Sequence, residues 1–313
     1  MENENAAVEE RQDEKKNWIV EERSYTACLS KGFEFFTANF KRLLTQMWPL
    51  LLVNALLSSV IIDALKSIQT QVLTDSINAL PALTELSVIS LLTILSYCVL
   101  LAQLMHVFNV YQKTGLMPTG NLKGLLRPVT QQFVRTVKWV CLVAPLTLAV
   151  VIIVGAVTIW TSRLAGMGMV ASHLLTCLIG FIVLLVVTTP LYYSYCRYLL
   201  NPDDHLLKMF LPSLSTGFRH FGLLFATSTI ASMLIAIFSL LVSIPTYIVI
   251  LTTLLSADNV VNGDPSGMPA NMGAVVFVVN IVCFFVSTFV KLTPLGPIVF
   301  AYGSIEKKES SRQ

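Results

Sequence analysis

One charged side chain, Lys291, lies well inside a long apolar segment of the sequence. A lysine inside a membrane-spanning helix costs several kcal/mol unless it is hydrated or paired, so such residues often line a solute pathway. Lys291 follows Ala274 by 17 residues, about 26 Å along a helix, so it can instead reach the membrane surface by snorkelling. Asp63 lies near the outer end of the first apolar segment and cannot easily pair with it. A proton relay between carboxylates is therefore not expected.

The four histidines are the residues that could bind a metal, because imidazole is the commonest metal ligand. His106, His205 and His220 are expected on the cytoplasmic side, and His173 on the opposite side. No pair has the HExxH spacing, and the six cysteines occur singly, without a CxxC pair. We expect no metal site; a membrane-embedded metalloenzyme ranks third among the functional hypotheses.

Motifs of soluble enzymes are absent from the sequence. It contains no GxxxxGK[ST], GxGxxG or GxSxG pattern, and its acidic residues do not form an opposed pair. The segment Asn201-Pro202-Asp203-Asp204 instead predicts a turn that ends one helix and caps the next. We therefore predict that the protein is not an enzyme, has no catalytic residues and needs no cofactor.

The elements that would position any site are apolar helices. Apolar residues make up 55% of the 313 residues and charged residues only 12%, whereas a soluble domain has about 25% charged residues. Six apolar segments reach the roughly 20 residues that a helix needs to cross a bilayer. They cover residues 47–65, 87–110, 139–160, 174–200, 221–253 and 274–302. Because they are unbroken rather than alternating, the predicted fold is an all-α bundle of six transmembrane helices.

Basic residues divide unevenly between alternate loops. Eighteen of the 21 fall in the terminal segments and in the loops after the second and fourth spans, whereas Lys66 and Arg163 lie on the other side. Lysine and arginine near short loops stay in the cytoplasm, so both termini are predicted to be cytoplasmic. This distribution favours anionic lipid headgroups as partners and argues against nucleic acid.

Three segments share a pattern that indicates an internal repeat. Each has a phenylalanine followed within two residues by arginine, at Phe40, Phe133 and Phe218, with apolar residues four, seven and eleven positions upstream. This spacing predicts three interfacial amphipathic helices, each leading into a transmembrane hairpin. The interfacial basic residues predicted to face lipid are Lys41, Arg42, Arg135 and Arg219.

The returning helices of the second and third repeats end alike. Pro190 and Pro294 each stand in a Thr-Pro-Leu sequence eight residues before a tyrosine, and Gln103 holds the corresponding place in the first repeat. Proline removes a helical hydrogen bond and should kink these helices, which either shapes packing or lines a cavity. The candidate residues for a cavity or transport pathway are Lys291, Gln103, Pro190 and Pro294.

The sequence predicts three regions along the chain. Residues 1–26 carry mixed charges and no apolar core of a signal peptide, so we expect a disordered cytoplasmic tail. Residues 27–303 are predicted to form the six-helix transmembrane domain. Residues 304–313 are predicted to form a cytoplasmic C-terminal tail.

The entry segments, the Thr-Pro-Leu exits and the closing Phe300-Ala301-Tyr302-Gly303-Ser304 segment resemble uncharacterised six-span membrane proteins of Bacteroides-type bacteria. They are also similar to the membrane domain joined to some glycerophosphodiester phosphodiesterases. The resemblance covers residues 27–308 and implies a membrane domain in a bacterial cytoplasmic membrane. It implies no hydrolase activity, because the soluble phosphodiesterase domain is absent from this sequence.

Two functional hypotheses of different classes follow from these features. The first is a non-enzymatic protein that handles envelope lipids or serves as a scaffold for a membrane protein partner, because three basic amphipathic helices are predicted and catalytic groups are lacking. The second is a transporter or channel for a small solute or lipid, motivated by the repeated prolines and Lys291.

Overall fold

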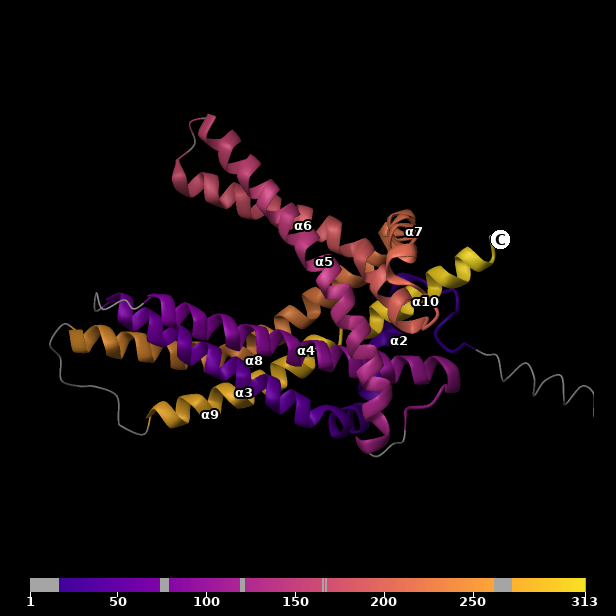
Figure 1. Cartoon of the computed structure of the whole chain (residues 1–313), viewed down its shortest axis with the longest axis horizontal. Helices are drawn as coiled ribbons and strands as arrows, with labels where there is room; N and C mark the ends of the chain where they lie inside the picture. Colours follow the sequence, from indigo (N-terminus) through magenta and orange to yellow (C-terminus); the bar gives the residue numbers. More distant parts are fainter. Residues whose placement is uncertain are drawn as a thin grey trace, which may run out of the picture. The chain divides into compact units, whose positions relative to one another are not determined.

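The computed structural model describes residues 17–73, 79–118, 122–164, 166, 168–261 and 272–312 (Figure 1). Within these ranges the chain forms helices and no strand, which confirms the predicted all-α fold. The helices are α2 (Tyr25–Ala38), α3 (Phe40–Leu73), α4 (Ala79–Thr114), α5 (Leu122–Leu164), α6 (Met169–Leu200), α7 (Leu206–Arg219), α8 (Phe221–Val261), α9 (Met272–Leu292) and α10 (Leu295–Ser310).

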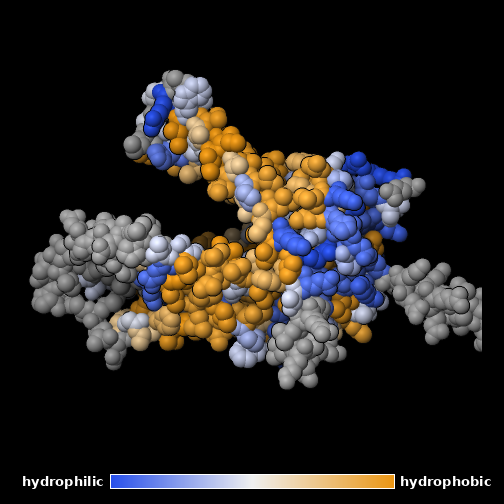
Figure 2. Space-filling view, in the orientation of Figure 1, coloured by the Kyte–Doolittle hydropathy of each residue, from blue (hydrophilic) through white to orange (hydrophobic). Residues whose placement is uncertain are grey.

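Within the described residues, six helical stretches are long and apolar enough to cross a membrane, as predicted. They are Phe40–Leu65, Thr84–Thr114, Val129–Arg163, Val170–Leu200, Phe221–Thr252 and Met272–Ser310. Many of their apolar side chains point outward: Ile152 and Phe181 are each at least 60% exposed. Figure 2 shows apolar residues along the α5–α6 hairpin and hydrophilic residues near its two ends. Lipid satisfies such an exposed apolar surface and water does not, so the chain is a multi-pass membrane protein.

The helices fall into two compact units. Unit 1 comprises Met1–Phe35, Leu104–Ile230 and Leu295–Gln313, and unit 2 comprises Phe36–Gln103 and Ala231–Pro294. The boundaries after Gln103 and Pro294 coincide with two of the three corresponding helix exits identified in the sequence. The residues predicted to form one transmembrane domain therefore belong to both units.

Polar side chains join the helices of unit 2. Asn54 of α3 donates from Nδ2 to Thr93 O and Ser96 Oγ of α4, at 3.3 and 3.4 Å. Its Oδ1 accepts a hydrogen bond from Thr288 of α9, at 3.2 Å. Gln103 of α4 donates to a backbone carbonyl of α3, Gln46 O, at 2.6 Å. Such bonds between membrane helices stabilise by about 1 kcal/mol each, so Gln103 has a packing role in unit 2.

Helix α10 forms the centre of unit 1. Every residue from Leu295 to Ile305 is buried, and the helix packs against α6. Gly32 of α2 lies directly against its first turn, because a Cβ added at Gly32 would be 2.2 Å from Pro297 N. The sixth candidate span is therefore two helices, with a turn at Thr293–Pro294 where the sequence predicts a kink.

Residues 17–24, which we call the N-terminal strap, run along α10. Ile19 is fully buried, and a Cβ added at Gly303 would lie only 2.2 Å from Ile19 O. Ser304 Oγ donates to Arg23 O at 3.0 Å and accepts from the Arg23 N–H at 2.9 Å. The strap therefore occupies a site on α10 that only glycine at position 303 leaves open.

The two predicted tails differ in how much of them the structure describes. Residues 1–16 of the predicted N-terminal tail lie outside the described residues, and the strap follows them. In the predicted C-terminal tail, α10 continues to Ser310, and Ser304 and Ile305 are buried. Part of each predicted tail thus belongs to the packing of unit 1.

Two of the three predicted interfacial helices are separate helices. A single residue, Asn39, separates α2 from α3, and a single residue, His220, separates α7 from α8. The second predicted interfacial segment runs into its span without a break, because α5 is continuous from Leu122 to Leu164. Gln132 precedes Phe133 where Asn39 precedes Phe40, and glutamine favours helix more than asparagine does. The internal repeat stays a prediction.

The thiol of Cys28 on α2 is expected to resist alkylation at neutral pH. Burial raises the pKa of Cys28 to about 11. Only the thiolate reacts, and at pH 8 about one thiol in a thousand is ionised with that pKa. Peptide mass spectrometry after N-ethylmaleimide treatment should find little Cys28 adduct at pH 8 and more as the pH rises toward 11. Protein unfolded in detergent is the control, and rapid modification of folded protein at pH 8 would contradict the prediction.

Candidate functional site

An open pocket of about 1380 Å³ lies in unit 1 where α6 ends and α7 begins, against the side of α5. Helix α6 ends at Leu200, and the Asn201 N–H still donates to Arg197 O at 3.1 Å. Pro202, Asp203 and Asp204 form the turn that the sequence predicts, and they line the pocket. The predicted cap is wrong, because His205 occupies the N-cap of α7 and makes no side-chain capping bond.

Arg135 of α5 holds this turn in place. Its guanidinium donates to Pro202 O at 2.6 Å, to Asn201 O at 2.8 Å and to Tyr198 O, and lies 4.1 Å from the centre of the Tyr198 ring. The last carbonyls of a helix have no partner within the helix, so these bonds satisfy the carboxyl end of α6. Arg135 was predicted to face lipid; its guanidinium is instead engaged by the protein backbone.

Two exposed lysines give the pocket its available positive charge. Lys138 lies one turn after Arg135 on α5, and Lys208 lies in the first turn of α7. Neither ammonium makes a hydrogen bond or ion pair within the described residues. Asp203 and Asp204 also line the pocket, but Asp204 pairs with Arg197 at 3.5 Å. An anion entering the pocket would therefore meet two unengaged cations.

The rest of the pocket wall is largely apolar, and α7 carries apolar residues on two faces. Phe210 of α7 packs with Val143 and Leu191 in a buried cluster. Leu207, which lines the pocket, and Leu211 on the outer face are 77% and 73% exposed. An outward stripe of large apolar residues on a short helix is typical of a helix lying in the membrane interface.

Pro190 marks the contact between α6 and α7. It is buried, and a Cβ added at Gly217 would lie 2.9 Å from Pro190 Cα. The glycine lets the two helix backbones approach closely, as small residues do between membrane helices. Pro190, predicted as a candidate for a cavity, therefore lies in helix packing beside the pocket but does not line it.

Most of the other predicted site residues lie in unit 2, and none of these lines the α6–α7 pocket. Lys291 is exposed in the last turn of α9, and Pro294 lies in the turn that follows α9. Lys41 and Arg42 are exposed in the first turn of α3 and make no side-chain hydrogen bond or ion pair in the part of the chain that the structure describes.

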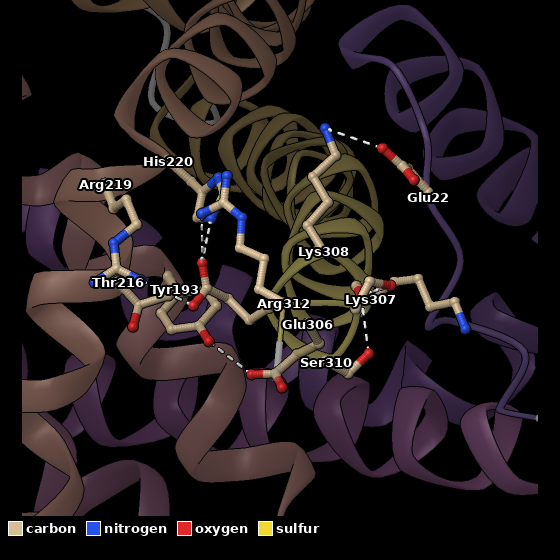
Figure 3. A network of polar contacts seen from close by, with 12 residues as sticks. Glu22, Tyr193, Thr216, Arg219, His220, Glu306, Lys307, Lys308, Ser310 and Arg312 are labelled. Atoms are coloured by element: carbon tan, nitrogen blue, oxygen red, sulfur yellow. Dashed lines mark hydrogen bonds and ion pairs between the residues drawn. The ribbon is translucent and has the colours of Figure 1, made fainter.

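A polar cluster on one side of α10 joins it to α6 and α7 (Figure 3). Tyr193 of α6 donates to Glu306 Oε1 at 2.6 Å. Glu309 contacts His220 Nε2 at 2.8 Å and Arg219 Nη1 at 3.0 Å. Arg219, predicted to face lipid, is thus paired with a carboxylate, although its side chain stays 56% exposed.

Sequence reasoning missed the residues of α10 that make these contacts. Tyr302, Glu306 and Glu309 follow the spacing of one helix face, and Tyr302 accepts a hydrogen bond from Asn201 at 3.2 Å. The spacing was visible in the sequence. It was not recognised because the predicted boundary after residue 303 placed Tyr302 in the transmembrane domain but Glu306 and Glu309 in a tail, where no helix was expected.

The histidines do not converge in the structure. His205 lines the pocket, His220 pairs with Glu309, and His106 lies on α4. Among the described residues, no group of three or more His, Cys, Asp or Glu side chains is placed to hold a metal ion.

Comparison of the chain with protein-family models, with curated proteins and with solved structures finds no match.

Proposed function

We propose that this membrane protein is a non-enzymatic lipid-handling protein that binds anionic phospholipid at the α6–α7 pocket. The observation that carries the proposal is the pair of unengaged ammonium groups, Lys138 of α5 and Lys208 of α7, in the lining of one open pocket. We further propose that the pocket lies on the cytoplasmic face of a bacterial cytoplasmic membrane, with both termini on that side. Support for that orientation comes from the distribution of basic residues.

A phospholipid phosphate suits the charges that surround this pocket. Charge-assisted hydrogen bonds from ammonium groups to phosphate are roughly twice as strong as neutral ones. Asp203 and Asp204 limit how much negative charge a ligand in the pocket can carry, because Arg197 neutralises only Asp204. A headgroup with a single negative charge, such as phosphatidylglycerol, is therefore favoured over a multiply charged one.

The apolar wall supports a lipid rather than a soluble anion. Val134 and Leu142 of α5 and Leu207 of α7 line the same pocket as the two lysines. The charged headgroup could lie against Lys138 and Lys208 while the acyl chains extend along the apolar surface of α5. A soluble phosphate has no apolar part to bury against that wall.

The test is lipid binding by a Lys138→Gln/Lys208→Gln double variant in detergent, measured by native mass spectrometry with phosphatidylglycerol and phosphatidylcholine. A lysine near a membrane surface contributes about 1 kcal/mol to binding anionic lipid, so the Kd for phosphatidylglycerol should rise on the order of 30-fold. Binding of phosphatidylcholine should not change.

The matched control removes the same charge from unit 1 outside the pocket, in Lys113→Gln/Lys307→Gln, where both lysines are exposed. It should retain phosphatidylglycerol binding close to that of the unmodified protein. Equal losses in the two double variants would indicate diffuse attraction and refute a pocket site, as would an unchanged Kd in the pocket variant.

A further inference from the structure

Helix α9 in unit 2 packs along α3 with a polar face. Its buried residues Val276, Asn280, Cys283 and Ser287 recur at intervals of four, three and four, which places them on one side of the helix. Thr288, the next residue, reaches Asn54 of α3. The two helices therefore bury amides, hydroxyls and a thiol in a protein segment surrounded by lipid.

Asn280 is the member of this face whose polar atoms are unsatisfied. The residue is 0% exposed, and neither Oδ1 nor Nδ2 has a hydrogen-bond partner among the described residues. Asn54 provides the contrast, because its amide bonds to both α4 and α9. Leaving a buried amide without hydrogen-bond partners costs about 1–3 kcal/mol. Water or another small polar molecule commonly supplies the missing hydrogen bonds.

The buried polar residues of unit 2 restrict the chemistry of what Asn280 could bind. The buried polar side chains of unit 2 in the described part of the chain are all neutral: Asn54, Ser59, Gln103, Thr246, Asn280, Ser287 and Thr288. Lys291 on the same helix is exposed. An ion would therefore find no buried counter-charge, whereas the amide offers donors and acceptors to a neutral molecule.

We propose that Asn280 binds a small uncharged hydrogen-bonding molecule, water first of all, in the packed face of α9. Its Nδ2 donates to the bound molecule and its Oδ1 accepts from it, which satisfies the amide that the protein leaves without a partner. Because the residue is fully buried, a second copy of the chain cannot reach it. The site is independent of the lipid pocket in unit 1, so either proposal can fail alone.

The test is water-edited solid-state NMR of the full chain in lipid bilayers, with ¹⁵N in the asparagine side chains. The Asn280 signal is assigned by its loss in Asn280→Gln, which keeps an amide. Magnetisation from water should reach the Asn280 amide several-fold faster than it reaches Asn54, whose amide is bonded to protein. Transfer as slow as that to Asn54 would overturn the proposal.

A second measurement identifies the molecule. Glycerol is added to the bilayers, and the Asn280 side-chain shift is followed. A glycerol-dependent shift would assign the site to small polyols as well as water, and fast water transfer without such a shift would assign it to water alone. Both results support the site, whereas water transfer to Asn280 as slow as that to Asn54 refutes it whatever the effect of glycerol.

Discussion

Replacing Gly303 by alanine is expected to displace the N-terminal strap and to destabilise unit 1 by about 3 kcal/mol. The added Cβ would lie 2.2 Å from Ile19 O, a backbone atom that cannot rotate away. The strap would have to move, which exposes Ile19 and breaks the paired hydrogen bonds between Arg23 and Ser304. In a thermal unfolding assay of detergent-solubilised protein, the Tm should fall on the order of 10 °C. Trypsin should cleave faster after Arg23.

Gly180→Ala is the matched control for this substitution. Gly180 lies inside α6, and a Cβ there meets no atom within 4 Å. Alanine favours helix by up to about 1 kcal/mol over glycine, so the Tm of this variant should be unchanged or higher. If Gly303→Ala were as stable as Gly180→Ala, the close contact between the strap and α10 would not exist in the protein.

Replacing Arg135 by glutamine is expected to release the turn between α6 and α7. The guanidinium satisfies the carbonyls of Tyr198, Asn201 and Pro202, and its loss leaves the carboxyl end of α6 without these donors. Hydrogen bonds to charged groups contribute about 1.5–3 kcal/mol each without being additive, so a loss on the order of 3 kcal/mol is expected. The endoproteinase Asp-N should cleave before Asp203 several-fold faster.

Two further variants distinguish the effect of the guanidinium's hydrogen-bond geometry from the effect of its charge. Arg135→Lys keeps the charge but lacks the planar guanidinium that reaches several carbonyls. Asp-N should therefore cleave this variant nearly as fast as Arg135→Gln. Arg42→Gln removes an exposed arginine whose side chain makes no hydrogen bond or ion pair in the described residues, and should behave like the unmodified protein. Normal resistance to Asp-N in Arg135→Lys would mean that charge, not the fork of donors, holds the turn.

Much of the helical architecture could be predicted because hydropathy acts along a contiguous segment. The six apolar segments correspond to the six candidate spans, and the Thr-Pro-Leu site at Pro294 coincides with a turn between two helices. The apolar spacing places residues on one face without indicating where a helix stops, so it did not show that α5 runs from its interfacial segment into its span without a break.

The pocket could be predicted only in part. Its turn was visible in the sequence at Asn201–Asp204, but the partners of the turn were not. Arg135 is 66 residues before Asn201, and no local pattern shows that its guanidinium reaches those carbonyls. Lys138 and Lys208 counted only as topology signals, because their shared pocket depends on how α7 packs against α5 and α6.

Composition and apolar run lengths establish from the sequence that this is a multi-pass helical membrane protein, because transfer into lipid depends on each segment's own residues. The use of its polar residues was decided by tertiary packing. Arg135 and Arg219 both look like lipid-facing basic residues, yet one satisfies the end of α6 and the other pairs with Glu309. Within the described residues, Lys138 and Lys208 make no hydrogen bond or ion pair, although Asp203 and Asp204 line the same pocket. Hydrogen bonds and ion pairs act over a few ångströms, so only the packed helices determine which charges are left to bind a ligand.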